Sequence, residues 1–142
     1  MDIRQIDARY HVSPQIAAED AEALAEAGFT RVICNRPDAE VPPSHQAEAI
    51  GEAVRAAGLE FEVLPLTHET MTPENVARQA ALVDTAPGKV LAYCASGTRC
   101  TVVWALGQAR RQSPEEILSA AAQAGYRIDG LRPTLDALAG RG

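Results

Sequence analysis

The chain has 142 residues, of which 46% are hydrophobic and 23% charged, and this size and composition predict one globular domain over residues 1–142 with no room for a second. Its 19 acidic and 13 basic residues give a net charge of −6, and no basic stretch contains interleaved aromatic residues, so we expect no nucleic-acid partner. The apolar runs are too short to span a membrane and the N-terminus carries no export signal, so we expect no membrane partner and a cytoplasmic location.

The pattern of apolar segments predicts the strands. The first dozen residues favour a small hairpin that extends the sheet, with arms at residues 3–6 and 10–12. Three short, β-rich segments then recur at intervals of about thirty residues, roughly the length of a βαβ unit. These segments are residues 31–34, 61–64 and 90–93. We therefore predict an α/β fold with a parallel-dominated central sheet flanked by helices.

Helical periodicity and clear start and stop residues predict the helices. They are expected at about residues 17–27, 45–57, 72–86, 99–111 and 113–125, with a short last helix after Pro133. The first two end at Gly28 and Gly58, which suit the left-handed position after a helix. Thr72 is the expected N-cap of the third, and Ser113 opens a capping-box pattern at the fifth.

Parallel strands bring the residues that follow them to one edge of the sheet, where open α/β folds bind their ligands. The segments expected at this edge are Asn35-Arg36-Pro37-Asp38, Leu66-Thr67-His68-Glu69 and Cys94-Ala95-Ser96-Gly97-Thr98-Arg99. We therefore place the functional site there.

The last of these segments has the pattern Cys-x-x-Gly-x-Arg between a strand and a helix. At Cys94 the loop amides and the following helix N-terminus would favour a thiolate, which makes this cysteine the candidate nucleophile. Gly97 permits a positive φ, and Arg99 offers a planar, permanently charged fork to an oxyanion. The substrate-binding amides would come from Ala95, Ser96, Gly97 and Thr98. The pattern predicts an anion held over a reactive sulfur.

These residues resemble the phosphatase-like domain family found in beta-lactamase hydrolase-like proteins. The resemblance extends over nearly the whole chain, through residues 28–33, Asn35-Arg36-Pro37-Asp38, the Cys94 to Arg99 loop, Trp104-Ala105-Leu106 and Ala124-Gly125-Tyr126. It implies a tyrosine-phosphatase-like fold, with Cys94 as the nucleophile and Arg99 as the anion-binding residue. The chain departs from the family pattern at Cys34, where a polar residue is expected, and at Cys100, where Ser or Thr usually supports the nucleophile.

The length of the loop favours one of two possible chemistries. Four residues separate Cys94 from Arg99, as in the rhodanese loop, whereas tyrosine phosphatases have five. A shorter loop offers one amide fewer and suits a terminal sulfur better than a phosphate ester. We therefore predict a sulfurtransferase that needs no cofactor, in which a Cys94 persulfide carries a sulfane sulfur from a small anionic donor to a thiol acceptor. The alternative is a cysteine-dependent phosphatase with a phosphocysteine intermediate.

A phosphatase also needs a general acid that protonates its leaving group, and no residue stands out for this role. His68 and Glu69 follow the second strand, where a solvated loop explains them equally well. Asp38 and Asp129 are weaker candidates. The missing acid adds to the preference for sulfur transfer.

Asn35 and Arg36 are expected beside the cysteine loop, where they would contribute to substrate binding. Arg36 offers a second positive charge to an anionic substrate. Alternatively, it forms an ion pair with Asp38 or Glu40 that fixes its own loop.

The remaining cysteines and aromatic residues have both structural and chemical interpretations. Cys100 could resolve an oxidised Cys94 by forming a disulfide, or it could be a buried packing thiol. A third functional hypothesis follows, in which the two thiols make a non-catalytic, anion-binding or redox-sensing module. Cys34 is expected in the core, and Trp104 and Tyr126 are expected to pack helices on the sheet. His11 and His45 lack metal-ligand spacing with any cysteine, so we predict no metal.

Overall fold

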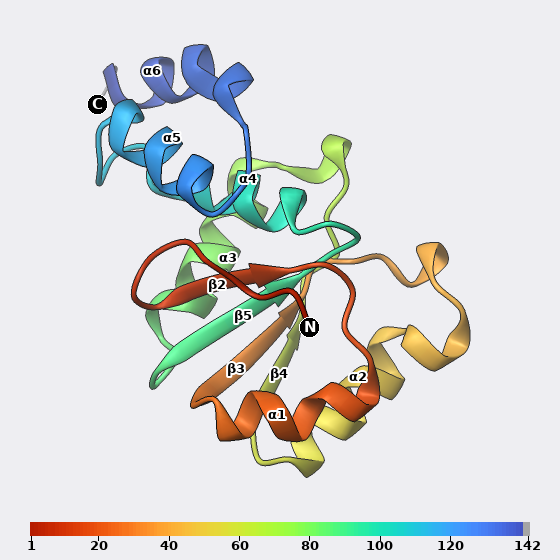
Figure 1. The fold of residues 1–142 in the computed structure, drawn as a ribbon. Helices are drawn as coiled ribbons and strands as arrows, with labels where there is room; N and C mark the ends of the chain where they lie inside the picture. Colours follow the sequence, from red (N-terminus) through yellow and green to blue (C-terminus); the bar gives the residue numbers. More distant parts are fainter. Residues whose placement is uncertain (141–142) are drawn as a thin grey trace.

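The computed structural model describes residues 1–140 and has a central sheet between two layers of helices (Figure 1). The strands are β1 (Arg4–Gln5), β2 (Tyr10–Ser13), β3 (Phe29–Cys34), β4 (Glu60–Val63) and β5 (Lys89–Tyr93). The α-helices are α1 (Ala21–Glu26), α2 (Ala47–Ala56), α3 (Pro73–Asp84), α4 (Thr98–Gly107), α5 (Pro114–Gln123) and α6 (Arg132–Gly140). Short 3₁₀ turns are η1 (Ala18–Asp20), η2 (Asp38–Glu40), η3 (Pro43–His45), η4 (His68–Thr70) and η5 (Asp129–Leu131).

The order of the strands in the sheet is β1-β2-β5-β3-β4. β1 is antiparallel to β2, and the other neighbouring pairs are parallel. The predicted hairpin, the predicted parallel strands and the α/β class are therefore confirmed. The hairpin extends the sheet, as predicted, because β2 also pairs with β5 and joins the hairpin to the parallel strands. As a result β5, which leads into the cysteine loop, is a central strand.

The two faces of the sheet are covered by different helices (Figure 1). Helices α1 and α2 pack on one face around Leu24, Ile50 and Phe61. Helices α4, α5 and α6 pack on the other around Trp104 and other residues of a second core cluster. Strand β5 is buried on both faces, as its uninterrupted apolar sequence requires. Its alternate side chains enter the two clusters in turn, because successive side chains of a strand point to opposite faces.

The ends of three helices differ from the predicted boundaries. The first helix, expected over residues 17–27, opens with the 3₁₀ turn η1, in which the Asp20 carboxylate accepts the Ala17 amide at 2.9 Å. The second begins at Ala47 instead of residue 45, because residues 43–45 form the separate turn η3. The fourth was expected to reach residue 111 and ends at Gly107, a residue that weakens a helix. The order and type of the predicted elements are unaffected.

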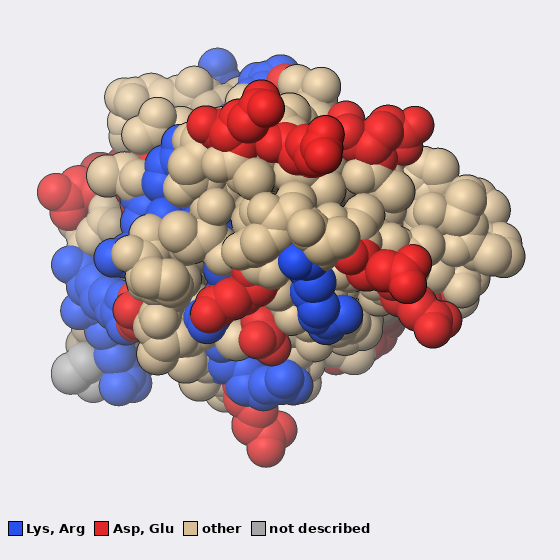
Figure 2. Space-filling model, turned by 90° about the horizontal axis from the view of Figure 1, so that it is seen from below, with Lys and Arg blue, Asp and Glu red and all other residues tan. Residues whose placement is uncertain are grey.

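Acidic and basic side chains alternate in short patches over the face shown in Figure 2, with acidic atoms grouped along its upper border. None of the helices within residues 1–140 combines the length and apolar character needed to cross a membrane. The same residues contain no cluster of three or more His, Cys, Asp or Glu side chains arranged to hold a metal ion.

Candidate active site

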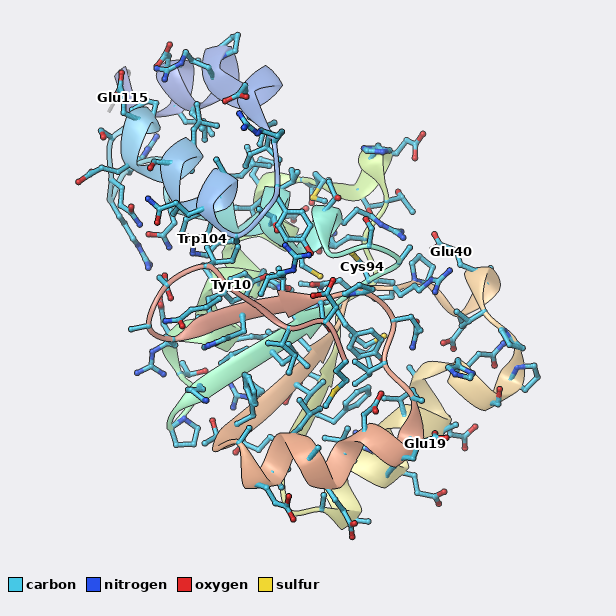
Figure 3. All side chains as sticks on the ribbon, viewed as in Figure 1. Tyr10, Glu19, Glu40, Cys94, Trp104 and Glu115 are labelled. Carbon is cyan, nitrogen blue, oxygen red and sulfur yellow. The ribbon has the colours of Figure 1, made fainter. Side chains whose placement is uncertain are left out.

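The loop from Cys94 to Arg99 connects the carboxyl end of β5 to the start of α4, as the sequence predicts. Gly97 is the N-cap of α4 and has φ +93°, a left-handed conformation that suits glycine. Its amide donates a hydrogen bond to Cys94 Sγ at 3.1 Å. Figure 3 shows Cys94 between the sheet and α4, with Tyr10 and Trp104 on one side and Glu40 on the other. The loop therefore encloses the sulfur with backbone N–H groups.

The surroundings of Cys94 lower its pKa to about 5. The largest cause is a hydrogen bond with the Cys100 thiol, which acts together with the amides of Cys100, Ser96 and Gly97 against the opposing effect of burial. Hydrogen bonds to the charged form favour ionisation. Cys94 is therefore a thiolate at neutral pH, which is the reactive form of a cysteine.

Cys100 occupies the first turn of α4 and is fully buried. Burial, followed by its hydrogen bond with Cys94, raises the pKa of the Cys100 thiol well above its ordinary value. Cys100 therefore stays protonated and donates to the thiolate, so its thiol takes the place of the hydroxyl whose absence the sequence indicated. The disulfide that would make this pair a redox sensor stays a prediction, because both cysteines are free thiols in the structure.

Arg99 lies at the rim of the loop and is held by two groups that are distant in the sequence. Its Nη1 donates to Glu40 Oε2 at 2.9 Å and to the Leu66 carbonyl at 2.8 Å, and its Nη2 donates to Glu40 Oε1 at 2.8 Å. The pKa of Glu40 is lowered, chiefly by this hydrogen bond with Arg99. The guanidinium is thus fixed in one orientation by a two-pronged ion pair.

The ion pair leaves one edge of the Arg99 guanidinium available. A guanidinium has five N–H donors, and three of those of Arg99 are used by Glu40 and Leu66. The Nε–H and the second Nη2–H have no acceptor among residues 1–140. These two donors form a parallel fork of the kind that binds two oxygens of a phosphate or carboxylate.

The other loop residues form an open rim above the sulfur. Ala95, Ser96 and Thr98 are exposed, whereas Cys94 and Gly97 are buried. Ser96 Oγ donates to Thr98 Oγ1 at 3.0 Å, so the two hydroxyls order each other. The structure therefore brings together all the residues predicted in the cysteine loop. Ala95, Ser96 and Thr98 lie at the surface, and the Cys94 sulfur is buried beneath them.

Asn35 lies beside the start of the cysteine loop, where its backbone amide donates to the Tyr93 carbonyl at 2.9 Å, but its side chain does not face the loop surface. It is fully buried, and its Nδ2 donates to the Leu64 carbonyl at 2.8 Å and to Gln79 Oε1 at 3.0 Å. Both amide hydrogens are thereby used inside the protein. The predicted substrate-binding role of Asn35 is therefore wrong: the side chain turns into the interior, where a buried amide needs partners.

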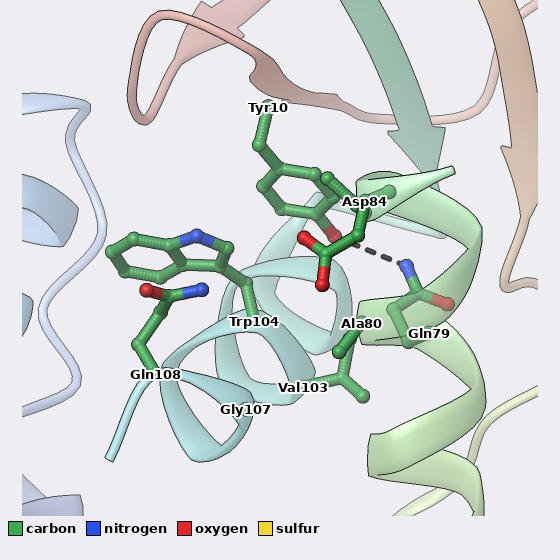
Figure 4. Close-up of a pocket in the computed structure, with 9 residues that line it drawn as sticks. Tyr10, Gln79, Ala80, Asp84, Val103, Trp104, Gly107 and Gln108 are labelled. Atoms are coloured by element: carbon green, nitrogen blue, oxygen red, sulfur yellow. Dashed lines mark hydrogen bonds between the residues drawn. The ribbon is translucent and has the colours of Figure 1, made fainter. Parts of the chain in front are cut away.

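Asn35 begins a buried series of hydrogen bonds that ends at Cys100, in the first turn of α4. Gln79 Nε2 donates to Asn35 Oδ1 at 3.0 Å and to the Tyr10 hydroxyl at 3.1 Å, which in turn donates to the Cys100 carbonyl at 2.7 Å. Figure 4 shows Gln79 and Tyr10 beside Trp104 in the wall of a small cavity. The volume of this cavity, about 20 Å³, suffices for about one water molecule. These hydrogen bonds connect α3 and β2 to Cys100 in α4, the residue that donates to Cys94.

Arg36 and Asp38, both expected near the substrate, bind other parts of the protein. Arg36 donates through Nε to Glu40 Oε1 at 3.2 Å and through Nη1 to Gln15 Oε1 at 3.3 Å. This is the ion-pair alternative of the sequence analysis. Asp38 Oδ1 accepts the Ala47 amide at 2.8 Å, at the start of α2. The carboxylate thus caps a helix, and Asp38 is not placed as a general acid.

His68 and Glu69 are exposed in the turn η4, which follows β4 at the same edge of the sheet as Cys94. Leu66, two residues before this turn, accepts a hydrogen bond from Arg99. The turn is therefore tied to the guanidinium at the rim of the site. Asp129 is exposed in η5, between α5 and α6.

Four residues that support the site were not predicted from the sequence. Glu40 was considered only as a partner of Arg36, Tyr126 only as a packing residue, and neither Gln79 nor Tyr10 was considered for the site. A glutamine that falls on the buried side of the amphipathic helix α3 was the one local indication of a buried polar chain.

Comparisons with known proteins agree on the family and the fold. The family described as "Beta-lactamase hydrolase-like protein, phosphatase-like domain" matches residues 2–111. A beta-lactamase hydrolase-like protein of Xylella fastidiosa is 31% identical over 108 residues, which cover 76% of this chain and 25% of that protein. The chain thus spans about a quarter of the length of the curated relatives it matches.

Solved structures are similar over almost the entire chain. The crystal structure of a candidate phosphatase from Neisseria meningitidis is 34% identical, with a TM-score of 0.86, and the similarity covers 96% of this chain and 98% of that one. Tk-PTP in its active form is 20% identical, with a TM-score of 0.70 and coverage of 99% and 97%. The latter similarity concerns the fold alone, and it confirms the tyrosine-phosphatase-like architecture.

The predicted sulfurtransferase function is wrong, because the matching family is described as phosphatase-like and the similar Neisseria meningitidis structure as a candidate phosphatase. The error lies in the argument from loop length. The number of residues between Cys94 and Arg99 does not determine how many hydrogen-bond donors contact the Cys94 sulfur. The Cys100 thiol and amide, both beyond Arg99, contribute to lowering the pKa of Cys94, so a short loop still surrounds the thiolate with donors.

Proposed function

Because the chain belongs to the family of phosphatase-like domains found in beta-lactamase hydrolase-like proteins, we propose that it is a cysteine-dependent phosphatase that hydrolyses phosphate monoesters. One observation carries the proposal: the Cys94 thiolate lies beneath a loop of inward amides whose rim ends in the available fork of Arg99. This arrangement combines a nucleophile with a site for the oxygens of a phosphoryl group.

The proposed reaction has two steps. In the first, the Cys94 thiolate attacks phosphorus, a P–S bond forms, and the P–O bond to the leaving group breaks. The leaving oxygen takes up a proton. In the second, water attacks the phosphocysteine, the P–S bond breaks, and inorganic phosphate leaves as the thiolate returns. No oxidant, reductant or cofactor takes part in either step.

Arg99 and the loop amides would stabilise the negative charge on the three non-bridging oxygens of the phosphoryl group. Two of these oxygens suit the Nε–H and Nη2–H fork, which is already oriented by Glu40. Because the guanidinium is held before the substrate binds, little reorganisation is needed in the transition state. In this proposal Glu40 positions Arg99 and makes no contact with the substrate.

The proton for the leaving group would come from the segment around η4. His68 and Glu69 are exposed there, and the hydrogen bond from Arg99 to Leu66 keeps this segment beside the site. An aryl phosphate has a good leaving group and needs this proton less than an alkyl phosphate does. Loss of the acid should therefore slow alkyl phosphates more than aryl phosphates.

We also propose that the protein works in the cytoplasm. All three cysteines are free thiols in the structure, and a thiolate nucleophile has to stay reduced to react. A reducing compartment keeps it so.

The proposal is tested with para-nitrophenyl phosphate and the variants Cys94→Ser and Cys34→Ser. Wild-type protein should hydrolyse the ester and, when quenched in acid, should carry a phosphoryl group on the Cys94 peptide. Cys94→Ser should lose more than about 10³-fold in kcat, because the nucleophile is absent. Cys34→Ser, the matched control at the end of the neighbouring strand, should keep most of the activity. Equal activity in wild type and Cys94→Ser would refute the proposal.

A further inference from the structure

A tyrosine far along the chain contacts the cysteine loop at one peptide group. The Tyr126 hydroxyl donates a hydrogen bond to the Ser96 carbonyl at 2.9 Å. The Gly97 amide, which donates to Cys94 Sγ at 3.1 Å, belongs to the same peptide group as that carbonyl. A peptide group is planar and trans, so its C=O and N–H point in opposite directions. Fixing the carbonyl on the outside therefore fixes the amide on the inside.

We propose that Tyr126 is a positioning residue of the active site, whose hydroxyl holds the Ser96–Gly97 peptide group in the orientation that directs the Gly97 amide at the Cys94 sulfur. The inference deepens the proposed phosphatase function, on which its catalytic meaning rests. A second effect acts in the same direction. A donor on the carbonyl polarises the peptide group, which makes the Gly97 N–H a better donor to the sulfur.

The absence of a side chain at Gly97 is part of this contact. A Cβ at this position would collide with the Tyr126 hydroxyl. Gly97 also has φ +93°, which other residues rarely adopt. The glycine therefore serves the loop twice, because it allows the turn into α4 and lets the tyrosine reach the backbone.

The backbone around Tyr126 is fixed by a helix-ending motif. At the end of α5 the Gly125 amide donates to the Ala122 carbonyl at 2.9 Å, and the Tyr126 amide donates to the Ala121 carbonyl at 2.9 Å. With Gly125 at φ +99°, these bonds form a Schellman motif. From the other side, Arg4 Nη1 donates to the Ala124 carbonyl at 2.9 Å. The backbone that leads into Tyr126 is thus fixed both by the end of α5 and by Arg4.

Tyr126 reaches the cysteine loop because the segment that carries it, the connection after α5, packs next to α4. The connection from α5 to α6 runs beside α4 (Figure 1), and the half-buried Tyr126 ring packs against the core cluster that contains Cys94 and Cys100. Residue 126 lies beyond residues 2–111, which the family match covers. The connection that follows α5 therefore contributes a hydrogen bond to the cysteine loop from outside the matched segment.

Removing the Tyr126 hydroxyl should weaken the hydrogen bond from the Gly97 amide to the Cys94 thiolate. The titratable groups around Cys94 are Cys100 and Arg99 on α4, Tyr10 on β2, and Tyr126 itself. A Tyr126→Phe substitution changes none of these charges at neutral pH. The affected quantity is the alignment of the Gly97 amide, so the proton affinity of Cys94 should increase.

The test measures the pH dependence of Cys94 alkylation by iodoacetamide in the wild type, in Tyr126→Phe and in Ser113→Ala. Ser113→Ala is the matched control, because it removes the N-cap of α5 and loosens the same helix pair without touching Tyr126. We expect Tyr126→Phe to raise the midpoint by about half a unit to one unit, because the Gly97 amide remains as a donor to the thiolate but is less well aligned. Ser113→Ala should leave it unchanged, and circular dichroism should show both variants folded.

Hydrolysis of para-nitrophenyl phosphate adds a second readout. At pH values below the wild-type midpoint of Cys94 ionisation, Tyr126→Phe should lower kcat/KM by about three- to tenfold. The loss should diminish at higher pH, where Cys94 is ionised in both proteins. An unchanged midpoint in Tyr126→Phe would overturn the inference, as would an equal rise in Ser113→Ala. If the wild type hydrolyses no phosphate ester, the proposed function fails while the alkylation result still decides the role of Tyr126.

Discussion

Two neighbouring loops of this protein, after β3 and after β5, each have a cysteine at their junction with the strand, but the two cysteines differ in chemistry. Cys34 ends β3 and Cys94 directly follows β5, the strand paired beside it, in which Tyr93 is the partner of Cys34. Both cysteines are buried. Each is followed by an arginine, Arg36 or Arg99, and both arginines bind the same carboxylate of Glu40. The nucleophile is nevertheless found in one loop only.

The difference lies in the backbone groups that meet each sulfur. The chain after Cys34 presents a carbonyl, because the Cys34 thiol donates to the Arg36 oxygen at 3.4 Å. Burial is the main reason that the pKa of Cys34 is raised. The chain after Cys94 turns at Gly97 into a helix and presents N–H groups. At Cys34 burial outweighs a single backbone hydrogen bond with Arg36 that lowers the pKa, whereas at Cys94 the Cys100 thiol and three backbone groups outweigh burial. The donors that reach each sulfur therefore decide its charge.

The two arginines provide the sharpest way to test this comparison. Arg99→Lys should lower kcat/KM for an aryl phosphate by about 10²-fold, because an ammonium cannot replace a rigid fork with two donors. Arg36→Lys should lower it by about threefold or less, since Arg36 binds Glu40 and Gln15 instead of the site. Steady-state kinetics of the two folded variants give the result. Equal losses would mean that the two loops contribute alike to substrate binding.

The two cysteines can be compared directly by their reactivity. At pH 6 Cys94, whose pKa is about 5, is largely ionised, whereas Cys34 is a thiol. Allowing for the lower nucleophilicity of a low-pKa thiolate, we expect iodoacetamide to alkylate Cys94 at least about tenfold faster than Cys34. Peptide mass spectrometry after short exposure measures both rates in one sample. Faster labelling of Cys34 would reverse the assignment of the nucleophile.

The same contrast should appear in the pH dependence of stability. A cysteine with a lowered pKa in the folded state stabilises it above the unfolded pKa, and this stabilisation is lost as the pH falls through the folded pKa. Between pH 9 and about pH 5, the folded-state pKa of Cys94, the advantage of wild type over Cys94→Ser should decrease by up to about 1.4 kcal/mol per pH unit. Urea unfolding at several pH values measures this difference.

Cys34 provides the control for the stability measurement. Because its pKa is raised in the folded state, it contributes stability below the unfolded pKa and loses it only as the pH rises above about 8.5. The free energy of unfolding of Cys34→Ser should therefore run parallel to that of wild type from pH 5 to pH 8. A pH-dependent difference in that range would show that Cys34 also ionises.

The last prediction concerns the thiol that donates to Cys94. Cys100→Ala removes the donor that contributes most to lowering the pKa of Cys94, so the midpoint of Cys94 alkylation should rise by about one to two units, more than in Tyr126→Phe. Cys100→Ser keeps a donor at the same position and should remain close to wild type. If alanine and serine behave alike, the thiol at position 100 is a packing group only.

The fold could be predicted from the sequence because its determinants are local. The apolar segments that became β3, β4 and β5, the glycines after α1 and α2, and the caps at Thr72 and Ser113 act over a few residues. The same applies to the central part of the site. The order Cys94, Gly97, Arg99 between a strand and a helix is sufficient to predict a thiolate surrounded by the backbone N–H groups of the loop.

The partners of those residues were decided by the tertiary structure alone. Glu40 meets Arg99 across 59 positions of sequence, and Tyr126 meets Ser96 across 30. No spacing rule connects residues so far apart, because such contacts depend on how the helices pack on the sheet. For the same reason the number of residues in the loop led to the wrong chemistry: the sequence determines which donors the loop itself contains, and only the folded chain determines which others reach the sulfur.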